Sequence, residues 1–253
     1  MNYIGLYTIF RKEVDRMFHV YLQTLLSPVI TTVLYFIVFG SAIGRNIPPI
    51  EGITYTQFIV PGLIMMSLLT NALSAASSGI YFQKFLGVIY EMLSAPLSYL
   101  EITLGFALAS VLRAIIIGIV ILGISALFTP LPIVHPIAAI FFAFLTALVF
   151  SLFGLIVGIW ANNFEKLSLM PMIVITPLTF LGGVFYTLDM LPPLWQKVTL
   201  ANPIFYMIDG LRWSFYGIAD IHPMASMALI IIFLLVCMAI LFWIFKTGYR
   251  LKS

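Results

Sequence analysis

Hydrophobic residues fill six long stretches of this chain, and polar residues gather between them. A helix that spans a bilayer needs about 20 mostly apolar residues. The pattern predicts six spanning helices, at residues 24–43, 58–80, 102–128, 137–160, 167–186 and 224–245. We therefore expect an all-α, polytopic membrane protein with one transmembrane domain over residues 1–253.

Residues 1–23 precede the first stretch and alternate at helical spacing. One face of a helix over residues 4–23 is apolar and carries Phe10, Val14, Met17, Phe18, Tyr21 and Leu25. The other face is polar and carries Arg11, Lys12, Asp15, Arg16, His19 and Gln23. This pattern predicts an amphipathic helix lying in the membrane interface. It either only anchors the first span or acts as a lever between cytoplasmic events and the spans.

The connection at residues 81–101 is amphipathic but cannot span, because it carries Lys84, Glu91 and Glu101 and because Pro96 ends any helix begun before it. Its aromatic and aliphatic side chains would be costly to expose to water. Two interpretations stay open: the segment docks on a partner protein, or it packs on the chain's own spans or on lipid headgroups. The candidate docking residues are Phe85, Leu86, Ile89, Tyr90, Glu91, Met92 and Leu93.

The connection at residues 187–223 is too broken for one helix, with glycines at 182–183 and prolines at 192–193. Its pieces are too short to span and are rich in the Trp and Tyr typical of a membrane interface. They predict a re-entrant helical hairpin in the outer leaflet, which must be covered by protein, or an aromatic cap that only seals the outer side. Asp209 and Arg212 are three apart and positioned to pair on one helical face. The candidate hairpin residues are Asp209, Arg212, Trp213 and Tyr216.

A few polar residues lie inside the predicted spans. Asn71, Ser74 and Ser78 recur at helical spacing in the second span, and Arg113 lies in the third. A charge in a span is expensive unless it is paired, hydrated or able to snorkel. The four residues are candidates for a translocation path or a dimer interface, or serve plain helix packing and snorkelling. The GxxxG at residues 154–158 favours close helix packing.

Composition and charge agree with a membrane protein. Hydrophobic residues make up 62% of the chain and charged residues only 8%, against about 25% charged in soluble domains. With the N-terminus inside, eight Lys and Arg fall in inner segments and three in outer ones, which predicts cytoplasmic ends and a cytoplasmic tail at 246–253. No basic stripe indicates nucleic acid, and the single cysteine excludes an intramolecular disulfide.

Several functional classes are disfavoured by what the chain lacks. No G-x-x-x-x-G-K-[ST] loop is present to bind ATP. The nine acidic residues fall in loops or at predicted helix ends, which weighs against an ion-coupled transporter. No arrangement of residues predicts a catalytic site or a metal site, so we do not expect the chain itself to be an enzyme.

The segments NPIFYMIDGLRWSFYG, QFIVPGLIMMS and TPLTFLGGVFYTLDMLPPLWQ resemble the ABC-2 type exporter permeases, especially their bacterial inner-membrane NodJ/YadH-like branch. The resemblance implies a permease that pairs with a second copy, as a homodimer, and docks two cytoplasmic ABC ATPase subunits. ATP and Mg²⁺ would then act on the ATPase and not on this chain. The docking helix would lie within 85–93, with Glu91 matching an acidic position of the family.

The resemblance also implies export by alternating access of a drug-like, polysaccharide, glycolipid or lipid substrate, with membrane lipids around the protein. Two other hypotheses remain: a membrane module that uses its ATPase to act on an envelope partner without transport, and an unrelated channel or membrane enzyme.

Overall fold

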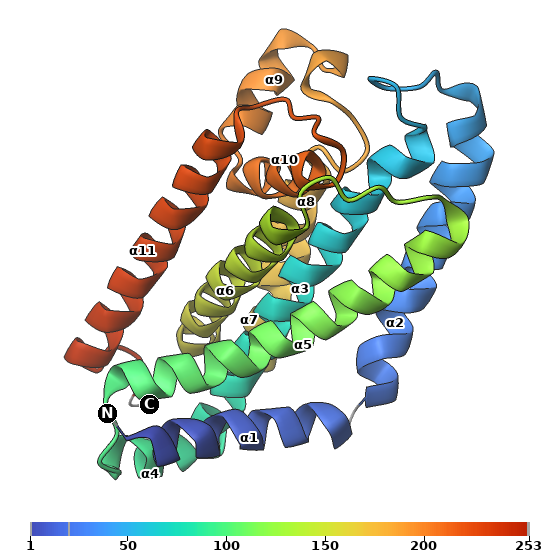
Figure 1. Cartoon of the computed structure of the whole chain (residues 1–253). Coiled ribbons are helices and arrows are strands. Elements are labelled where there is room, and N and C mark those ends of the chain that lie inside the picture. Colours follow the sequence, from blue (N-terminus) through green and yellow to red (C-terminus); the bar gives the residue numbers. More distant parts are fainter. Residues whose placement is uncertain (1, 20, 252–253) are drawn as a thin grey trace.

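The computed structural model describes residues 2–19 and 21–251, and helices dominate it (Figure 1). Within these residues, four helices are long and apolar enough to cross a membrane. They are α3 (Tyr55–Phe85), α5 (Tyr99–Phe128), α6 (Pro136–Trp160) and α11 (Pro223–Thr247). They cover the second, third, fourth and last predicted spans and extend each by a few residues.

The first and fifth predicted spans are helical but not regular α-helices. The first is α2 (Tyr21–Tyr35) followed by the π-helix η1 (Phe36–Ile43), and a short 3₁₀ turn η2 (Gly44–Asn46) follows. The fifth consists of α7 (Phe164–Leu169), the π-helix η3 (Met170–Ile175) and α8 (Thr176–Phe180). Pro171 and Pro177 have no N–H to donate, so the regular α-helical ladder is interrupted there. This run ends at Phe180, six residues before the predicted end at 186, because a turn with Gly183 at φ +77° follows.

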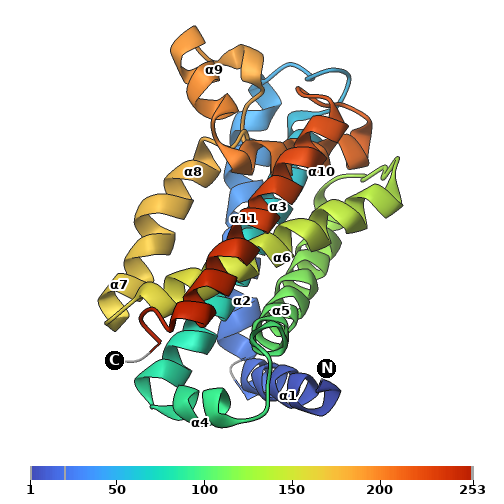
Figure 2. The ribbon, with the colours of Figure 1, turned by 90° about the vertical axis from the view of Figure 1, so that its left-hand side faces the viewer.

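The remaining helices lie at the two ends of the molecule (Figures 1 and 2). They are α1 (Tyr3–His19), α4 (Val88–Ser94), η4 (Leu188–Met190), α9 (Pro193–Leu200) and α10 (Pro203–Tyr216). Helices α1 and α4 lie at one end, together with both ends of the described chain, and α9 and α10 lie at the other. We call these the α1 end and the α10 end.

Local signals in the sequence fix where two of the long helices begin. Thr54 and Gln57 form a reciprocal capping box before α3, and Ser98 and Glu101 form another before α5. Each box satisfies backbone N–H groups that the first helical turn leaves without partners. Glu101 also accepts a hydrogen bond from the backbone N–H of Asn2, so the start of α1 is tied to the start of α5.

Helix α3 is the centre of the fold and is buried along most of its length against α5, α6 and α10. Gly154 and Gly158 let α6 approach it closely. A Cβ added at Gly154 would lie 2.5 Å from the carbonyl oxygen of Leu73, and one added at Gly158 would lie 2.4 Å from that of Ser77. The GxxxG prediction of close helix packing is confirmed.

Candidate functional site

One side of α3 stays open while the rest of the helix is buried. Its partly or fully exposed positions between residues 66 and 78 are Met66, Ser67, Thr70, Asn71, Ser74 and Ser78. All but Met66 are polar and lie three or four residues apart in sequence, which places them on one helical face. Asn71, Ser74 and Ser78, predicted from their spacing, belong to this polar stripe.

A cavity of about 280 Å³ lies over the stripe, between α2, α3 and α5. Helix α3 lines it with Asn71 and Ser74, among others, and α5 contributes Arg113. A second cavity of about 210 Å³ lies beside it toward α1, and Ser78 and Arg113 line this one. The four residues predicted as a path or dimer interface therefore surround two neighbouring cavities that share Arg113. We call the two cavities together the polar groove.

The sequence interpretation missed the wall of the groove that α2 supplies. This wall carries Thr24, Ser27, Thr31, Thr32 and Tyr35. Their spacing of three or four residues follows one helical face, and this periodicity was the signal available in the first apolar stretch.

Arg113 is partly buried and lies 14 residues along α5 from its first residue Tyr99, or about four helical turns. Its Nε is buried and has no hydrogen-bond partner within the described part of the chain. The ion pairs found among the described residues do not include it. Arg113 is thus an uncompensated cation between the two halves of the groove.

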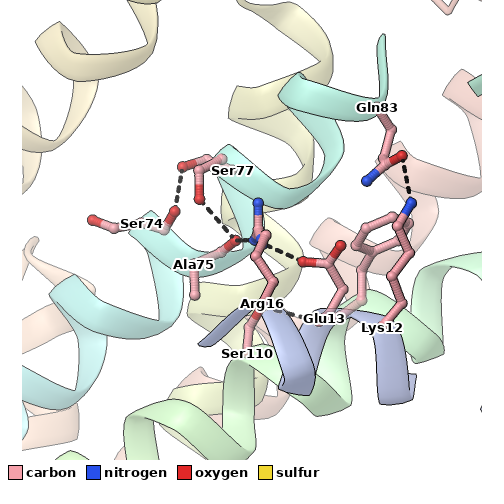
Figure 3. A network of polar contacts seen from close by, with 10 residues as sticks. Lys12, Glu13, Arg16, Ser74, Ala75, Ser77, Gln83 and Ser110 are labelled. Carbon is pink, nitrogen blue, oxygen red and sulfur yellow. Dashed lines mark hydrogen bonds and ion pairs between the residues drawn. The ribbon is translucent and has the colours of Figure 1, made fainter. Parts of the chain in front are cut away.

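Helix α1 closes the groove at its end through polar contacts (Figure 3). Arg16 Nη2 lies 2.6 Å from Glu13 Oε2 and donates to the carbonyl oxygen of Ala75 at 3.3 Å. Lys12 Nζ donates to Gln83 Oε1 at 2.9 Å. Burial raises the pKa of the Glu13 carboxyl, while Arg16 and Lys12 act in the opposite direction.

The two predicted faces of the first helix differ in their surroundings. Lys12 and Arg16 of the predicted polar face contact α3, and Phe18 of the predicted apolar face is exposed. The buried stripe is Ile9, Glu13 and Met17, because α1 packs on α5 along this i, i+4, i+8 line.

The predicted extent of the first helix is wrong. Residues 21–23 belong to α2, which runs in a different direction from α1 (Figure 1). Residues 1 and 20 lie outside the described residues, as do the side chains of Tyr21, Gln23 and Leu25 and the last two residues of the predicted tail at 246–253.

At the α1 end, the predicted docking residues form two groups. Gly87, at φ +75°, separates the end of α3 from the short helix α4. Phe85 and Leu86 are 71% and 68% exposed, and Tyr90 and Glu91 are also exposed. Ile89 is only 2% exposed, and Met92 and Leu93 pack against the same apolar cluster, so these three anchor α4 while the other four present the surface.

Two basic residues bind the C-terminal end of α6. Lys84 Nζ donates to the carbonyl oxygens of Ile159 at 2.9 Å and Ala161 at 3.4 Å. Arg250 Nη1 donates to the carbonyl oxygen of Trp160 at 2.8 Å. Cations at a helix C-terminus satisfy its free carbonyls and complement its dipole.

At the α10 end, Arg212 is 1% exposed and its guanidinium stacks on the ring of Phe58, 4.0 Å from the centroid. It donates to the carbonyl oxygen of Gly183 and forms an ion pair with Asp220 at 3.6 Å. The fully buried Asp209 accepts hydrogen bonds from the backbone N–H groups of Asp220 and Ile221 at 2.9 and 3.0 Å. The sequence predicted Asp209 as the ion-pair partner of Arg212, but the ion pair is with Asp220. Asp209 instead binds the backbone of the loop that carries Asp220.

The other two predicted hairpin residues join α10 to neighbouring segments. Trp213 stacks on His135 with ring centroids 4.5 Å apart, and Tyr216 donates to the carbonyl oxygen of Gln57 at 2.9 Å. All four candidates therefore lie on one helix and fix it to surrounding elements. Burial raises the pKa of Asp209 to about 6, although its backbone hydrogen bonds and Arg212 act in the opposite direction.

Among the residues that the structure describes, no group of three or more His, Cys, Asp or Glu side chains could hold a metal ion. The polar groups that line the polar groove are hydroxyl, amide and guanidinium groups and the carboxylate of Glu13, which bind by hydrogen bonding and charge.

Comparisons with known proteins give one consistent result. The model of the ABC-2 type transporter family matches residues 5–216. The chain is 41% identical over 253 residues to Inner membrane transport permease YadH of Escherichia coli K12, covering 100% of this chain and 99% of the relative. It is 26% identical over 215 residues to Nodulation protein J of Rhizobium leguminosarum bv. viciae, covering 82% and 79%. It is 24% identical over 206 residues to Nodulation protein J of Rhizobium meliloti, covering 79% and 77%.

Proposed function

The chain belongs to the ABC-2 type transporter family, and on this premise we propose that it is the permease subunit of an ATP-driven exporter. It crosses the bacterial inner membrane six times, with both ends in the cytoplasm. Its substrate is a lipid, a polysaccharide or glycolipid, or a hydrophobic drug-like molecule. Two copies of a separate ABC ATPase bind ATP and Mg²⁺ and drive alternating access.

The observation that carries this proposal is the polar groove on the otherwise buried helix α3. Serine, threonine and asparagine side chains on an outward face find no hydrogen-bond partners among lipid tails, and an unpaired arginine there costs free energy. A face of this kind belongs either beside a second copy of the chain or along a substrate path. In a homodimer it serves both purposes, because a path between two copies is opened and closed by moving one against the other.

Helix α4 is the proposed site of ATPase docking. Phe85 and Leu86 at its border are large, apolar and exposed at the α1 end, and exposed apolar groups favour burial against a partner. The tie between Asn2 and Glu101 links α1 to the start of α5 just after this segment. A displacement of α4 would therefore be transmitted to α1 and to the Arg16 end of the polar groove.

Co-purification tests the proposal. The tagged full chain is extracted from its native host in mild detergent, and the proteins that remain bound are identified and quantified. We expect an ABC ATPase near one-to-one, lost in Glu91→Arg and retained in Asp189→Arg. The control makes the same charge change at an exposed residue of the α10 end.

Recovery of stable permease with no ATPase, under conditions that preserve a known exporter complex, would reject the exporter. A second copy carrying a different tag should co-purify with the first. An ATPase that binds while membrane vesicles accumulate no substrate class in response to ATP would favour the module that acts on an envelope partner.

A further inference from the structure

The polar groove carries an excess positive charge. Arg113 and Arg16 line it, and Glu13 is the one acidic residue among the described residues that line either cavity. Glu13 is already paired with Arg16 at 2.6 Å. Among the residues that the structure describes, Arg113 therefore has no counter-charge, and none that lines the larger cavity is acidic.

The geometry around Arg113 suits an oxygen-rich anion. Its buried Nε lacks a partner, and a guanidinium presents several donors in a planar fork that matches phosphate and carboxylate. The larger cavity adds donors from Ser74 and Asn71 on α3 and from Thr31 and Thr32 on α2. An uncompensated buried donor and cation cost free energy until a ligand satisfies them.

We infer that the polar groove binds the anionic headgroup of an amphiphile, with its phosphate or carboxylate on Arg113. The headgroup fits the polar cavity of about 280 Å³. Apolar side chains beside it, such as Leu63 and Met66, lie where the acyl chain begins. This inference rests on the proposed function and narrows its substrate class, from lipids, sugars and drugs in general to an anionic lipid or glycolipid.

Binding is measured without the ATPase, on the purified full chain in a neutral detergent. The probe is dihexanoyl phosphatidylglycerol, with dihexanoyl phosphatidylcholine and inorganic phosphate as comparison ligands, and the readout is the ligand-dependent shift in Tm. We expect saturable stabilisation by phosphatidylglycerol and little by phosphatidylcholine. Arg113→Gln should weaken the apparent affinity about tenfold or more, and Arg113→Lys, which keeps the charge, should lose less.

Ser74→Glu provides a second variant that leaves Arg113 in place. Ser74 is exposed in the groove, and a carboxylate there would supply the missing counter-charge and compete with the ligand. It should abolish the phosphatidylglycerol response, while the unliganded Tm is equal to or higher than that of the parent because Arg113 gains a counter-charge. A Ser74→Gln variant matches Glu in size but is neutral and keeps a donor, so it should lose much less of the response than Ser74→Glu.

Equal affinity for phosphatidylglycerol in the parent, Arg113→Gln and Ser74→Glu would overturn the inference. So would stabilisation by inorganic phosphate as strong as that by phosphatidylglycerol, because the site would then take a free oxyanion and not an amphiphile. The binding assay needs no ATPase, so the two proposals can fail separately. If the chain co-purifies with its ATPase but phosphatidylglycerol does not shift the Tm, only the inferred ligand class is rejected. A chain that binds phosphatidylglycerol here but recovers no ATPase in the co-purification disproves only the exporter.

Discussion

The close contact between α6 and α3 makes a sharp prediction for Gly158→Ala. The new Cβ would lie 2.4 Å from the carbonyl oxygen of Ser77 and 2.4 Å from Cγ2 of Ile80. Non-bonded carbon atoms at ordinary contact lie about 3.5–4.0 Å apart. The Ile80 side chain is able to rotate away, but the Ser77 oxygen belongs to the backbone of α3, so the two helices must separate by about 1 Å.

The expected magnitude follows from two opposing terms. Overpacking of a close-packed interior costs about 1–3 kcal/mol, and replacing glycine by alanine inside a helix gains up to about 1 kcal/mol. Gly123→Ala in α5 is the matched control, because a Cβ at Gly123 meets nothing within 4 Å. Both variants gain the same helix propensity from replacing glycine by alanine, so this gain cancels when their free energies of unfolding are compared. Gly158→Ala should therefore be about 1–3 kcal/mol less stable than Gly123→Ala.

Thermal unfolding of the detergent-purified chain measures this difference. For a chain of this size, 1 kcal/mol corresponds to about 2–4 °C in Tm, so Gly158→Ala should melt several degrees below Gly123→Ala. Both are compared at one detergent and protein concentration. Equal melting temperatures would refute the reasoning, because they would show that α3 and α6 are not in contact at this glycine.

Other predictions concern the charged residues at both ends. Arg212→Met should destabilise the chain by about 3–5 kcal/mol, since it leaves Asp220 without its partner in a protected site; adding Asp220→Asn should restore part of the Tm. The pKa of Asp209 is raised to about 6 in the folded chain, against an ordinary 3.8. Between these values the folded chain holds a proton that the unfolded chain releases, so the contribution of Asp209 to stability should fall as pH rises from about 4 to 6. Asp209→Asn should therefore flatten that part of the Tm–pH curve, and an unchanged slope would contradict this assignment. Lys84→Met removes one of the two cations at the end of α6 and should cost about 1 kcal/mol, whereas Lys166→Met, at an exposed position, should leave the Tm unchanged.

The sequence predicted where the helices lie better than how regular they are. The apolar stretches located four long helices to within a few residues, because apolar length limits what a bilayer accepts. The π-helical turns at Phe36–Ile43 and Met170–Ile175 were not predicted. Hydropathy reports the apolar character of a segment and is insensitive to one extra residue in a helical turn.

The orientation of α1 shows a second limit. Its amphipathic pattern was evident, but the pattern did not show that Lys12 and Arg16 donate hydrogen bonds to α3. A hydrophobic pattern assumes that polar side chains seek water. Here the acceptors are Gln83 and the backbone of α3, and only the packing of α1 across the bundle brings them within reach.

By itself, the sequence determined that this is a helical membrane protein without an ATP-binding loop, and its segments identified the family. These properties depend on composition, apolar length and local motifs, which need no knowledge of neighbours. The tertiary structure decided that Asn71, Ser74 and Ser78 form the open side of α3 and that Arg113 reaches them from α5. It also paired Arg212 with Asp220, not with the Asp209 that spacing suggested. Helical spacing fixes which residues share a face, but which face a neighbouring helix covers depends on long-range packing.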